Sequence, residues 1–244
     1  MGNPVSWFDV AGPTPEKAAG FYSQLFSWEI QEAPGYDYRM IDTHAGSGIN
    51  GGLARQQEGQ APASLIHVQG PDIQALLDEA VSLGGTVAMP VTENEMVTYA
   101  MFVDPWGNTV GLVKGPEDEV RPPSPGDNPP VDWFEMVCTD PKKAWAFYRE
   151  LFGWEIKESE GDGYLHGSID SGNGGARGGI GSSMDGQPHV TLYAHVDDPA
   201  KYVERAESLG ATTTMPVTDI GEGTVLAHFT DTQGATFGVY TMKS

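Results

Sequence analysis

The chain has 244 residues and a formal net charge of −21, because 34 acidic side chains stand against 13 basic ones. So acidic a chain repels phosphate backbones and anionic lipids, and we expect neither nucleic acid nor a membrane among its partners. It contains no run of about 18 apolar residues that would form a transmembrane helix. The single cysteine, Cys138, rules out an intrachain disulfide and predicts a cytoplasmic protein.

The sequence contains an internal repeat. Trp7-Phe8-Asp9-Val10 returns 126 residues later as Trp133-Phe134-Glu135-Met136, and Met89-Pro90-Val91-Thr92 returns as Met215-Pro216-Val217-Thr218. Such self-similarity indicates two homologous halves, so a site in one half should have a counterpart in the other. Between them, residues 116–129 are rich in proline and acid and predict a linker. The expected domains are therefore residues 1–115 and 130–244.

Within the first half, the pattern predicts a strand at 6–10 and then a helix that begins at Thr14-Pro15. Three short strands should follow near residues 29, 38–41 and 52–54. A second unit repeats this order, with a strand at 64–68, a helix near 73–80 and three strands near 86–89, 97–103 and 109–113. A β-α-β-β-β order thus occurs twice in each half and four times in the chain.

Two motifs carry a resemblance to a known superfamily. Ala-x-x-Phe-Tyr-x-x-Leu-Phe-x-Trp-Glu occurs at 18–29 and 144–155, and Phe-x-Asp-Pro-Trp-Gly-Asn-Thr occurs at 102–109, with a weaker copy at 231–234. With the module order, they resemble the vicinal oxygen chelate superfamily of glyoxalase I, bleomycin-resistance proteins and extradiol dioxygenases, and in it the two-repeat bacterial proteins related to lactoylglutathione lyase. The resemblance implies an α+β fold, in which βαβββ modules pair into curved mixed sheets around clefts, with the helices outside.

The resemblance also implies a divalent metal with four ligands. They are a His on the first strand, a Glu near the fourth strand, a His on the first strand of the second module and a Glu on the last strand. None of the corresponding residues offers an imidazole or a carboxylate. They are Trp7 and Trp133, glycines near 51–52 and 178–179, Ala63 and Thr191, and Gly111 and Gly238. We therefore expect no metal bound through this ligand set, and no cofactor.

Two acids are the main candidates for catalytic residues. Residues two apart on a strand share a face, so Asp9 should lie beside Trp7, and Glu135 beside Trp133, in the cleft. A carboxylate among aromatic rings needs a partner or a proton, which makes both acids candidate general bases or hydrogen-bond acceptors. The structural alternative is a carboxylate held by backbone N–H groups, or by Arg39 or Arg177.

His67 and His195 each precede a strand-end valine, and we treat them as matching positions of the repeat. Each could move protons near neutral pH, or bind a loop carbonyl for a structural reason. The other four histidines have no match across the repeat and are weaker candidates: His44, His166, His189 and His228.

The aromatic candidates are ligand-binding residues. Tyr38 and Tyr164 match at a spacing of 126 and could orient a carbonyl or quinone oxygen, or be half-buried strand residues. Trp7, Trp133 and Trp106 could stack on a flat ligand, or fill the volume that a metal would take. Cys138 falls on the opposite strand face from Glu135, which predicts an unreactive core thiol.

Three functions remain open. The first is binding of a small aromatic or polyketide-like molecule in a metal-free cleft; the second is a metal-independent lyase, isomerase or cyclase that uses Asp9 or Glu135 as a base. The third, a metal-dependent glyoxalase or dioxygenase, lacks its ligands.

The modules could pair in two ways. The two modules of one half could share a cleft, with Asp9 near His67. In the alternative that we prefer, the first module of one half faces the second module of the other half, with Asp9 near His195. We expect a monomer or a weak homodimer.

Overall fold

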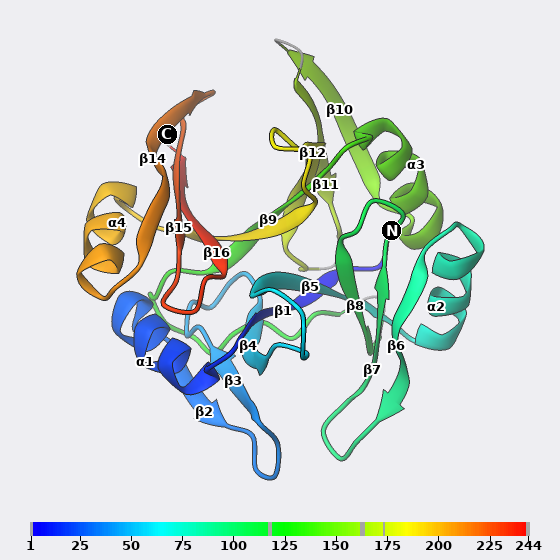
Figure 1. Cartoon of the computed structure of the whole chain (residues 1–244), viewed down its shortest axis with the longest axis horizontal. Coiled ribbons are helices and arrows are strands. Elements are labelled where there is room, and N and C mark those ends of the chain that lie inside the picture. The colour runs from blue at the N-terminus through cyan, green and yellow to red at the C-terminus, as the bar shows by residue number, and fades with distance from the viewer. Residues whose placement is uncertain (1, 117–118, 162–163, 173, 243–244) are drawn as a thin grey trace. The chain divides into compact units, whose positions relative to one another are not determined.

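The computed structural model describes residues 2–116, 119–161, 164–172 and 174–242 (Figure 1). It confirms the predicted module order in both halves. The first half consists of β1 (Val5–Gly12), α1 (Pro15–Phe26), β2 (Glu29–Glu32), β3 (Tyr38–Asp42), β4 (Asn50–Arg55), β5 (Ala63–Gly70), α2 (Ile73–Ser82), β6 (Thr86–Glu93), β7 (Thr98–Val103) and β8 (Thr109–Lys114). The second half consists of β9 (Val131–Cys138), α3 (Pro141–Phe152), β10 (Glu155–Gly161), β11 (Tyr164–Asp170), β12 (Arg177–Ser182), β13 (His189–His195), α4 (Pro199–Ser208), β14 (Thr212–Gly221), β15 (Thr224–Thr230) and β16 (Thr236–Met242).

Each half contributes one eight-stranded sheet. The strand orders are β2-β3-β4-β1-β5-β8-β7-β6 and β10-β11-β12-β9-β13-β16-β15-β14. The hairpins are antiparallel, whereas β5 pairs with β8 and β13 with β16 in parallel, so both sheets are mixed. The predicted α+β class is confirmed.

Helices α1 and α2 begin where the sequence predicts. Pro15 occupies the first turn of α1 after Thr14, although the Thr14 side chain makes no capping hydrogen bond. Asp72 caps α2 by accepting from the Ala75 N–H at 3.0 Å, and Asp198 caps α4 by accepting from the Ala200 N–H at 3.1 Å. The buried face of α1 includes Phe21, Tyr22 and Leu25, as its spacing predicts.

The chain divides into two compact units, and each unit takes one module from each half. The first comprises Met1–Trp7, Leu65–Arg121 and Phe134–Val190; the second comprises Phe8–Ser64, Pro122–Trp133 and Thr191–Ser244. In the first unit α2 contacts α3, and in the second α1 contacts α4. Modules of one half therefore share a sheet, whereas modules of different halves pack together in one compact unit. Whether Asp9 lies nearer to His67 or to His195 stays a prediction.

A buried aspartate in each unit joins its two modules. Asp104, in the turn between β7 and β8, accepts a hydrogen bond from the Tyr148 hydroxyl of α3 at 2.9 Å. Asp231, in the turn between β15 and β16, accepts one from Tyr22 of α1 at 3.1 Å. Burial raises the pKa of both carboxyls, and their hydrogen bonds only partly offset it. The Asp-Pro-x-Gly turn is thus a structural element that holds a helix of the other half.

The predicted linker, apart from 117–118, which lie outside the described residues, is attached to the first half. Ser124 donates from both its N–H and its hydroxyl to the Asp42 carboxylate. The Trp28 indole donates to the Pro129 carbonyl at 2.9 Å, and the Asn128 amide donates to the Ser27 carbonyl at 3.0 Å. These bonds place the segment against β3 and the end of α1.

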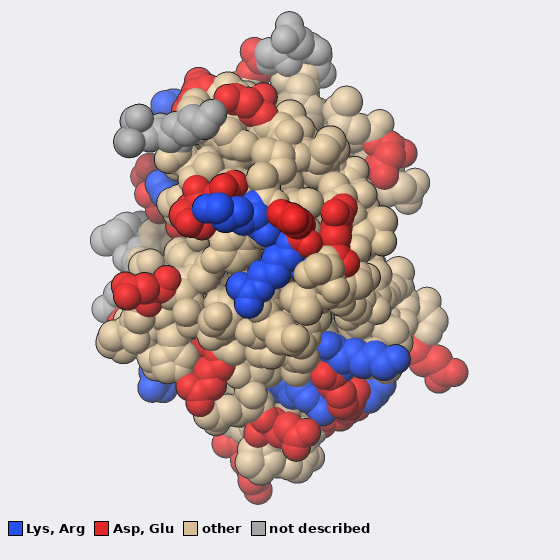
Figure 2. Space-filling model, turned by 90° about the vertical axis from the view of Figure 1, so that its left-hand side faces the viewer, with Lys and Arg blue, Asp and Glu red and all other residues tan. Residues whose placement is uncertain are grey.

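In the part of the chain that the structure describes, no helix is both long and apolar enough to cross a membrane. On the face drawn in Figure 2, basic side chains lie next to acidic ones rather than forming a continuous basic surface. Ion pairs such as Arg39–Glu32 and Lys201–Asp198 show the same mixing.

The Asp104–Tyr148 bond predicts a stability change. Tyr148→Phe removes a donor from a buried carboxyl, and we expect it to lower the free energy of unfolding by about 1–3 kcal/mol. Urea denaturation measures the change, with Tyr36→Phe, at an exposed position, as the control. Equal stability of the two variants would contradict the structural role of this bond.

Candidate functional site

The candidate site lies on the sheet face opposite the helices. On β1, Phe8 points to the helix side, where its ring centroid is 5.9 Å from that of Trp28. Trp7 and Asp9 alternate with it and therefore lie on the other face. On β9, Phe134 packs against Trp154 on the helix side, so Trp133 and Glu135 take the opposite face. The predicted orientation of these four residues is thus what the structure has.

Asp9 is paired with Tyr38. The Tyr38 hydroxyl donates to Asp9 Oδ1 at 2.6 Å, and Asp9 is only 5% exposed. The structural alternative named Arg39 as the partner, but Arg39 forms ion pairs with Glu16, Glu32 and Asp37 instead. A phenol is therefore one hydrogen-bond partner of this buried carboxylate.

Glu135 is paired with His166, which the sequence analysis ranked low. His166 Nε2 shares a hydrogen bond with Glu135 Oε2 at 3.2 Å and lies 3.1 Å from Oε1. Oε1 is buried and has no well-aligned hydrogen-bond partner among the described residues. The hydrogen bond to Glu135 raises the pKa of His166, because the carboxylate favours the imidazolium, and burial offsets it only in part. Arg177 is exposed.

The match of Tyr38 with Tyr164 is wrong. Ile30 pairs with Ile41 in the β2–β3 hairpin, and Ile156 pairs with Ile169 in the β10–β11 hairpin. The second hairpin is longer by two residues, so the structural counterpart of Tyr38 is His166. Both lie three residues before the paired isoleucine, and both bind the first-strand carboxylate. Tyr164 lies one alternation further, with its ring stacked 6.4 Å from that of His166; burial raises the pKa of its phenol.

The match of His67 with His195 is also wrong. His67 is paired opposite Gly111, and the residue paired opposite the corresponding Gly238 is Tyr193. The caps Asp72 and Asp198 show why, because they fix a spacing of 126 in this region. By the same spacing the counterpart of Thr191 is Leu65, not Ala63. Leucine is no metal ligand either, so we still expect no metal ligand at the position of the superfamily's second His.

His195 belongs to another group of polar side chains. Its ring stacks on that of Tyr240 at 4.7 Å, and its Nδ1 lies 3.7 Å from Asp132 Oδ2. Tyr240 donates to Asp132 Oδ1 at 2.8 Å. One alternation away, the Tyr193 hydroxyl and His228 Nε2 share a hydrogen bond of 2.6 Å.

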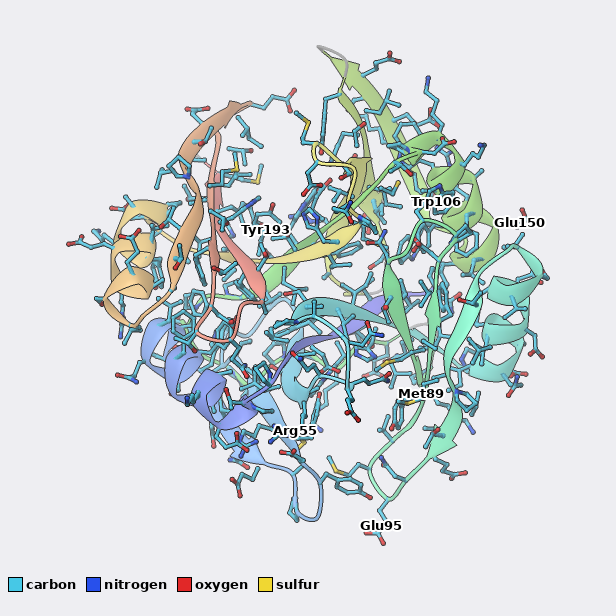
Figure 3. The ribbon with its side chains drawn as sticks, in the orientation of Figure 1. Arg55, Met89, Glu95, Trp106, Glu150 and Tyr193 are labelled. Carbon is cyan, nitrogen blue, oxygen red and sulfur yellow. The ribbon has the colours of Figure 1, made fainter. Side chains whose placement is uncertain are left out.

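The tryptophans have different environments. Trp7 and Trp133 are half-buried on the face opposite the helices. Trp106 lies in the turn between β7 and β8 and packs edge-on against Phe147 of α3, with centroids 5.8 Å apart (Figure 3). It therefore lies apart from the polar pairs on the sheet. Cys138 is a buried thiol, as predicted, and burial raises its pKa to about 12.

The residues at the implied metal positions do not fit a metal. Within the described ranges, no group of three or more His, Cys, Asp or Glu side chains is arranged to hold a metal ion. The strand glycines also leave no room for a ligand. A Cβ at Gly111 would lie 2.0 Å from His67 Nδ1, and one at Gly238 would lie 2.4 Å from the Tyr193 ring. A neighbouring side chain already occupies the space that a carboxylate ligand would need.

The same holds on the fourth strand of each half. A Cβ at Gly52 would lie 1.9 Å from the Tyr38 hydroxyl, and one at Gly179 would lie 2.3 Å from His166 Nε2. The Tyr and His partners of the two carboxylates thus fill the space beside these glycines.

Comparison with known proteins agrees with this architecture. A family model described as "Glyoxalase-like domain" matches residues 7–113 and again 132–240. "Putative glyoxylase CFP32" of Mycobacterium tuberculosis is 26% identical over 243 residues, covering 96% of this chain and 93% of the relative. "Anthracycline biosynthesis protein DauV" of Streptomyces sp. (strain C5) is 26% identical over 266 residues, covering 98% of this chain and 93% of the relative.

Two solved structures share the fold. The Mn(II)-bound glyoxalase from Novosphingobium aromaticivorans superposes with a TM-score of 0.70 at 13% identity, covering 99% of this chain and 83% of that one. BphC, a halotolerant catechol dioxygenase, superposes with a TM-score of 0.67 at 14% identity, covering 99% and 87%.

The Glu135–His166 pair predicts a pH response. Glu135→Gln removes the carboxylate and should lower the pKa of His166 toward its ordinary value, as followed by NMR titration of the imidazole. Because the folded-state pKa is raised, the pair stabilises the protein fully below about pH 6.5 and loses this effect as the pH rises through the raised value. Asp9→Asn is the matched control and should leave the titration of His166 unchanged. An unchanged His166 pKa in Glu135→Gln would contradict the pairing.

The filled glycine positions predict a clash. Gly111→Ala places a methyl group against the His67 ring and should destabilise the protein by about 1–3 kcal/mol. A second substitution, His67→Ala, should recover part of the loss. Gly20→Ala is the control, since no atom lies within 4 Å of its added Cβ and alanine favours the helix by about 0.5–1 kcal/mol. Thermal unfolding measures all of these variants, and a neutral Gly111→Ala would show that the space is free.

Proposed function

From the premise that the chain belongs to the glyoxalase-like family of the vicinal oxygen chelate superfamily, we propose that it binds a small aromatic molecule without the family's metal. One observation carries this proposal: tryptophan and glycine occupy the implied ligand positions, and His67, Tyr193, Tyr38 and His166 fill the space beside the glycines. A ligand at this face would meet aromatic rings and a few polar groups rather than a Lewis acid.

The chemistry of these side chains supports an aromatic ligand. Trp7 and Trp133 are half-buried, and each lies two residues from a paired carboxylate. An indole stacks on a flat ring system, while the neighbouring phenol or imidazole can bind an oxygen substituent of that ring. The name of one relative, an anthracycline biosynthesis protein, adds support for a polyketide-like ligand.

A metal-independent acid–base enzyme is the second candidate, and the Glu135–His166 pair favours it. The buried Oε1 of Glu135 has a lone pair available to take a proton from a substrate C–H or O–H group. The imidazolium of His166, favoured by its raised pKa, would hold the carboxylate in place and balance its charge. Such a pair suits a lyase, isomerase or cyclase reaction. Asp9, bound to Tyr38, is the corresponding base in the first half. A metal-dependent glyoxalase or dioxygenase has the least support, because its ligand residues are absent from the positions described.

We further propose that the protein acts in the cytoplasm as a monomer or weak homodimer. The single cysteine, buried and with a raised pKa, supports a reducing compartment. The attachment of residues 124–129 to the first half supports a folded unit of one chain.

Fluorescence titration tests the proposed function. The chelator-treated protein is titrated with 1-hydroxyanthraquinone, and quenching of tryptophan emission reports binding. We expect saturable 1:1 or 2:1 binding with the same dissociation constant before chelation, after chelation and after addition of Mn²⁺. Binding that requires added metal would contradict the proposal.

The substitutions Asp9→Asn and Glu135→Gln separate the two candidate functions. If the protein only binds, both variants should keep an affinity within about three-fold of the parent, since each loses at most one modest hydrogen bond. If the acid–base reaction is correct, Glu135→Gln should abolish turnover of a co-purified substrate, identified by native mass spectrometry, and retain its binding.

A further inference from the structure

The two halves carry different chemistry at equivalent positions of their second modules. In the second half, a row across β13, β16 and β15 contains Tyr193, Gly238 and His228, paired in register. The equivalent row across β5, β8 and β7 contains His67, Gly111 and Met101. The Tyr193–His228 pair is therefore replaced in the first half by His67 and Met101, with a thioether in place of the His228 imidazole.

A second polar group shows the same difference. Tyr240, which bonds to Asp132 and stacks on His195, is paired opposite His195. The equivalents of these three residues in the first half are Val113, Ser6 and Gln69. The first half thus lacks both the phenol and the carboxylate of this group. Met89 pairs with Met101 as Met215 pairs with His228, so the two halves agree at this position and differ at the next strand (Figure 3).

We propose that the two halves recognise different ligands, and that Tyr193, His228, Tyr240, Asp132 and His195 form a site in the second half for a hydroxylated aromatic ligand. This inference rests on the proposed function, because it names the ligand class that one half of the protein selects. The same positions in the first half suit an aromatic ligand that lacks the hydroxyl.

The Tyr193–His228 bond explains how a hydroxyl would be recognised. A phenol oxygen both donates one hydrogen bond and accepts two. If Tyr193 donates to His228, its oxygen can accept from a ligand hydroxyl; if His228 donates, the Tyr193 O–H can turn to a ligand oxygen. The ring of Tyr193, 5% exposed, is held in place beside Gly238, so little rotamer entropy is lost on binding.

Tyr240 and Asp132 form a second polar anchor within the same unit of the chain. Their centre is close to that of the first pair, since the rings of Tyr193 and Tyr240 lie 6.3 Å apart and perpendicular. His195, with 40% of its side chain exposed, is the solvent-facing member. A flat ligand with more than one oxygen substituent could form a hydrogen bond with each of these anchors.

Paired ligands and paired variants test the inference. Dissociation constants are measured for 1-hydroxyanthraquinone and for anthraquinone, which lacks the hydroxyl. We expect the wild-type protein to prefer the hydroxylated compound by at least about five-fold, the effect of one well-placed hydrogen bond. Tyr193→Phe and His228→Leu should reduce this preference toward one, whereas Met101→Leu, at the position equivalent to His228, should leave it unchanged.

A second measurement locates the hydroxylated ligand independently of these variants. Trp7 and Trp133 occupy equivalent positions in the two halves, so Trp133→Phe should remove most of the quenching by 1-hydroxyanthraquinone, while Trp7→Phe should retain it. The reverse pattern would overturn the inference. So would a hydroxyl preference that is absent in the wild-type protein or survives both Tyr193→Phe and His228→Leu, although the proposed function would stand in these cases. If neither compound binds the wild-type protein, the proposed function itself fails.

Discussion

The site depends on how side chains of one strand fill the space beside glycines of the neighbouring strand. Where a strand has glycine, the side chain across the ladder takes the space that a Cβ would need: His67 beside Gly111, Tyr193 beside Gly238 and Tyr38 beside Gly52. A protein interior does not tolerate an atom at 2 Å, so these phenols and imidazoles and a metal-binding carboxylate exclude one another. The sheet therefore keeps the superfamily's backbone while presenting different chemistry.

A second constraint links the halves of the chain. Tyr22 and Tyr148 each bond to the buried aspartate of a turn in the other half, so each compact unit combines modules that are distant in sequence. Because such buried bonds are costly to leave unmade, they fix which modules pack together. The polar pairs of the site are held within these units: Asp9–Tyr38 and Tyr193–His228 in one, and Glu135–His166 in the other.

The fold could be predicted almost completely because the repeat gave every element twice, with helix faces and turn motifs in phase. The faces of Trp7, Asp9, Trp133 and Glu135 follow from strand alternation and were predicted correctly. His166 was missed because two extra residues in one hairpin shift the spacing from 126 to 128, and a single spacing cannot reveal that. Tyr193 was missed because strand-end valines, rather than the caps Asp72 and Asp198, were used to align the repeat, and His228 was ranked low because its counterpart is Met101. A hydrogen bond between strands becomes visible only once the register is known.

Anomalous diffraction from crystals soaked in Mn²⁺ tests most directly the claim that neighbouring side chains have replaced the metal site. The account predicts no manganese peak within coordination distance of Trp7, Gly111 or Glu135, and the Tyr38 and His67 side chains still beside their glycines. A manganese ion held by His67, His166 or either first-strand carboxylate would contradict it.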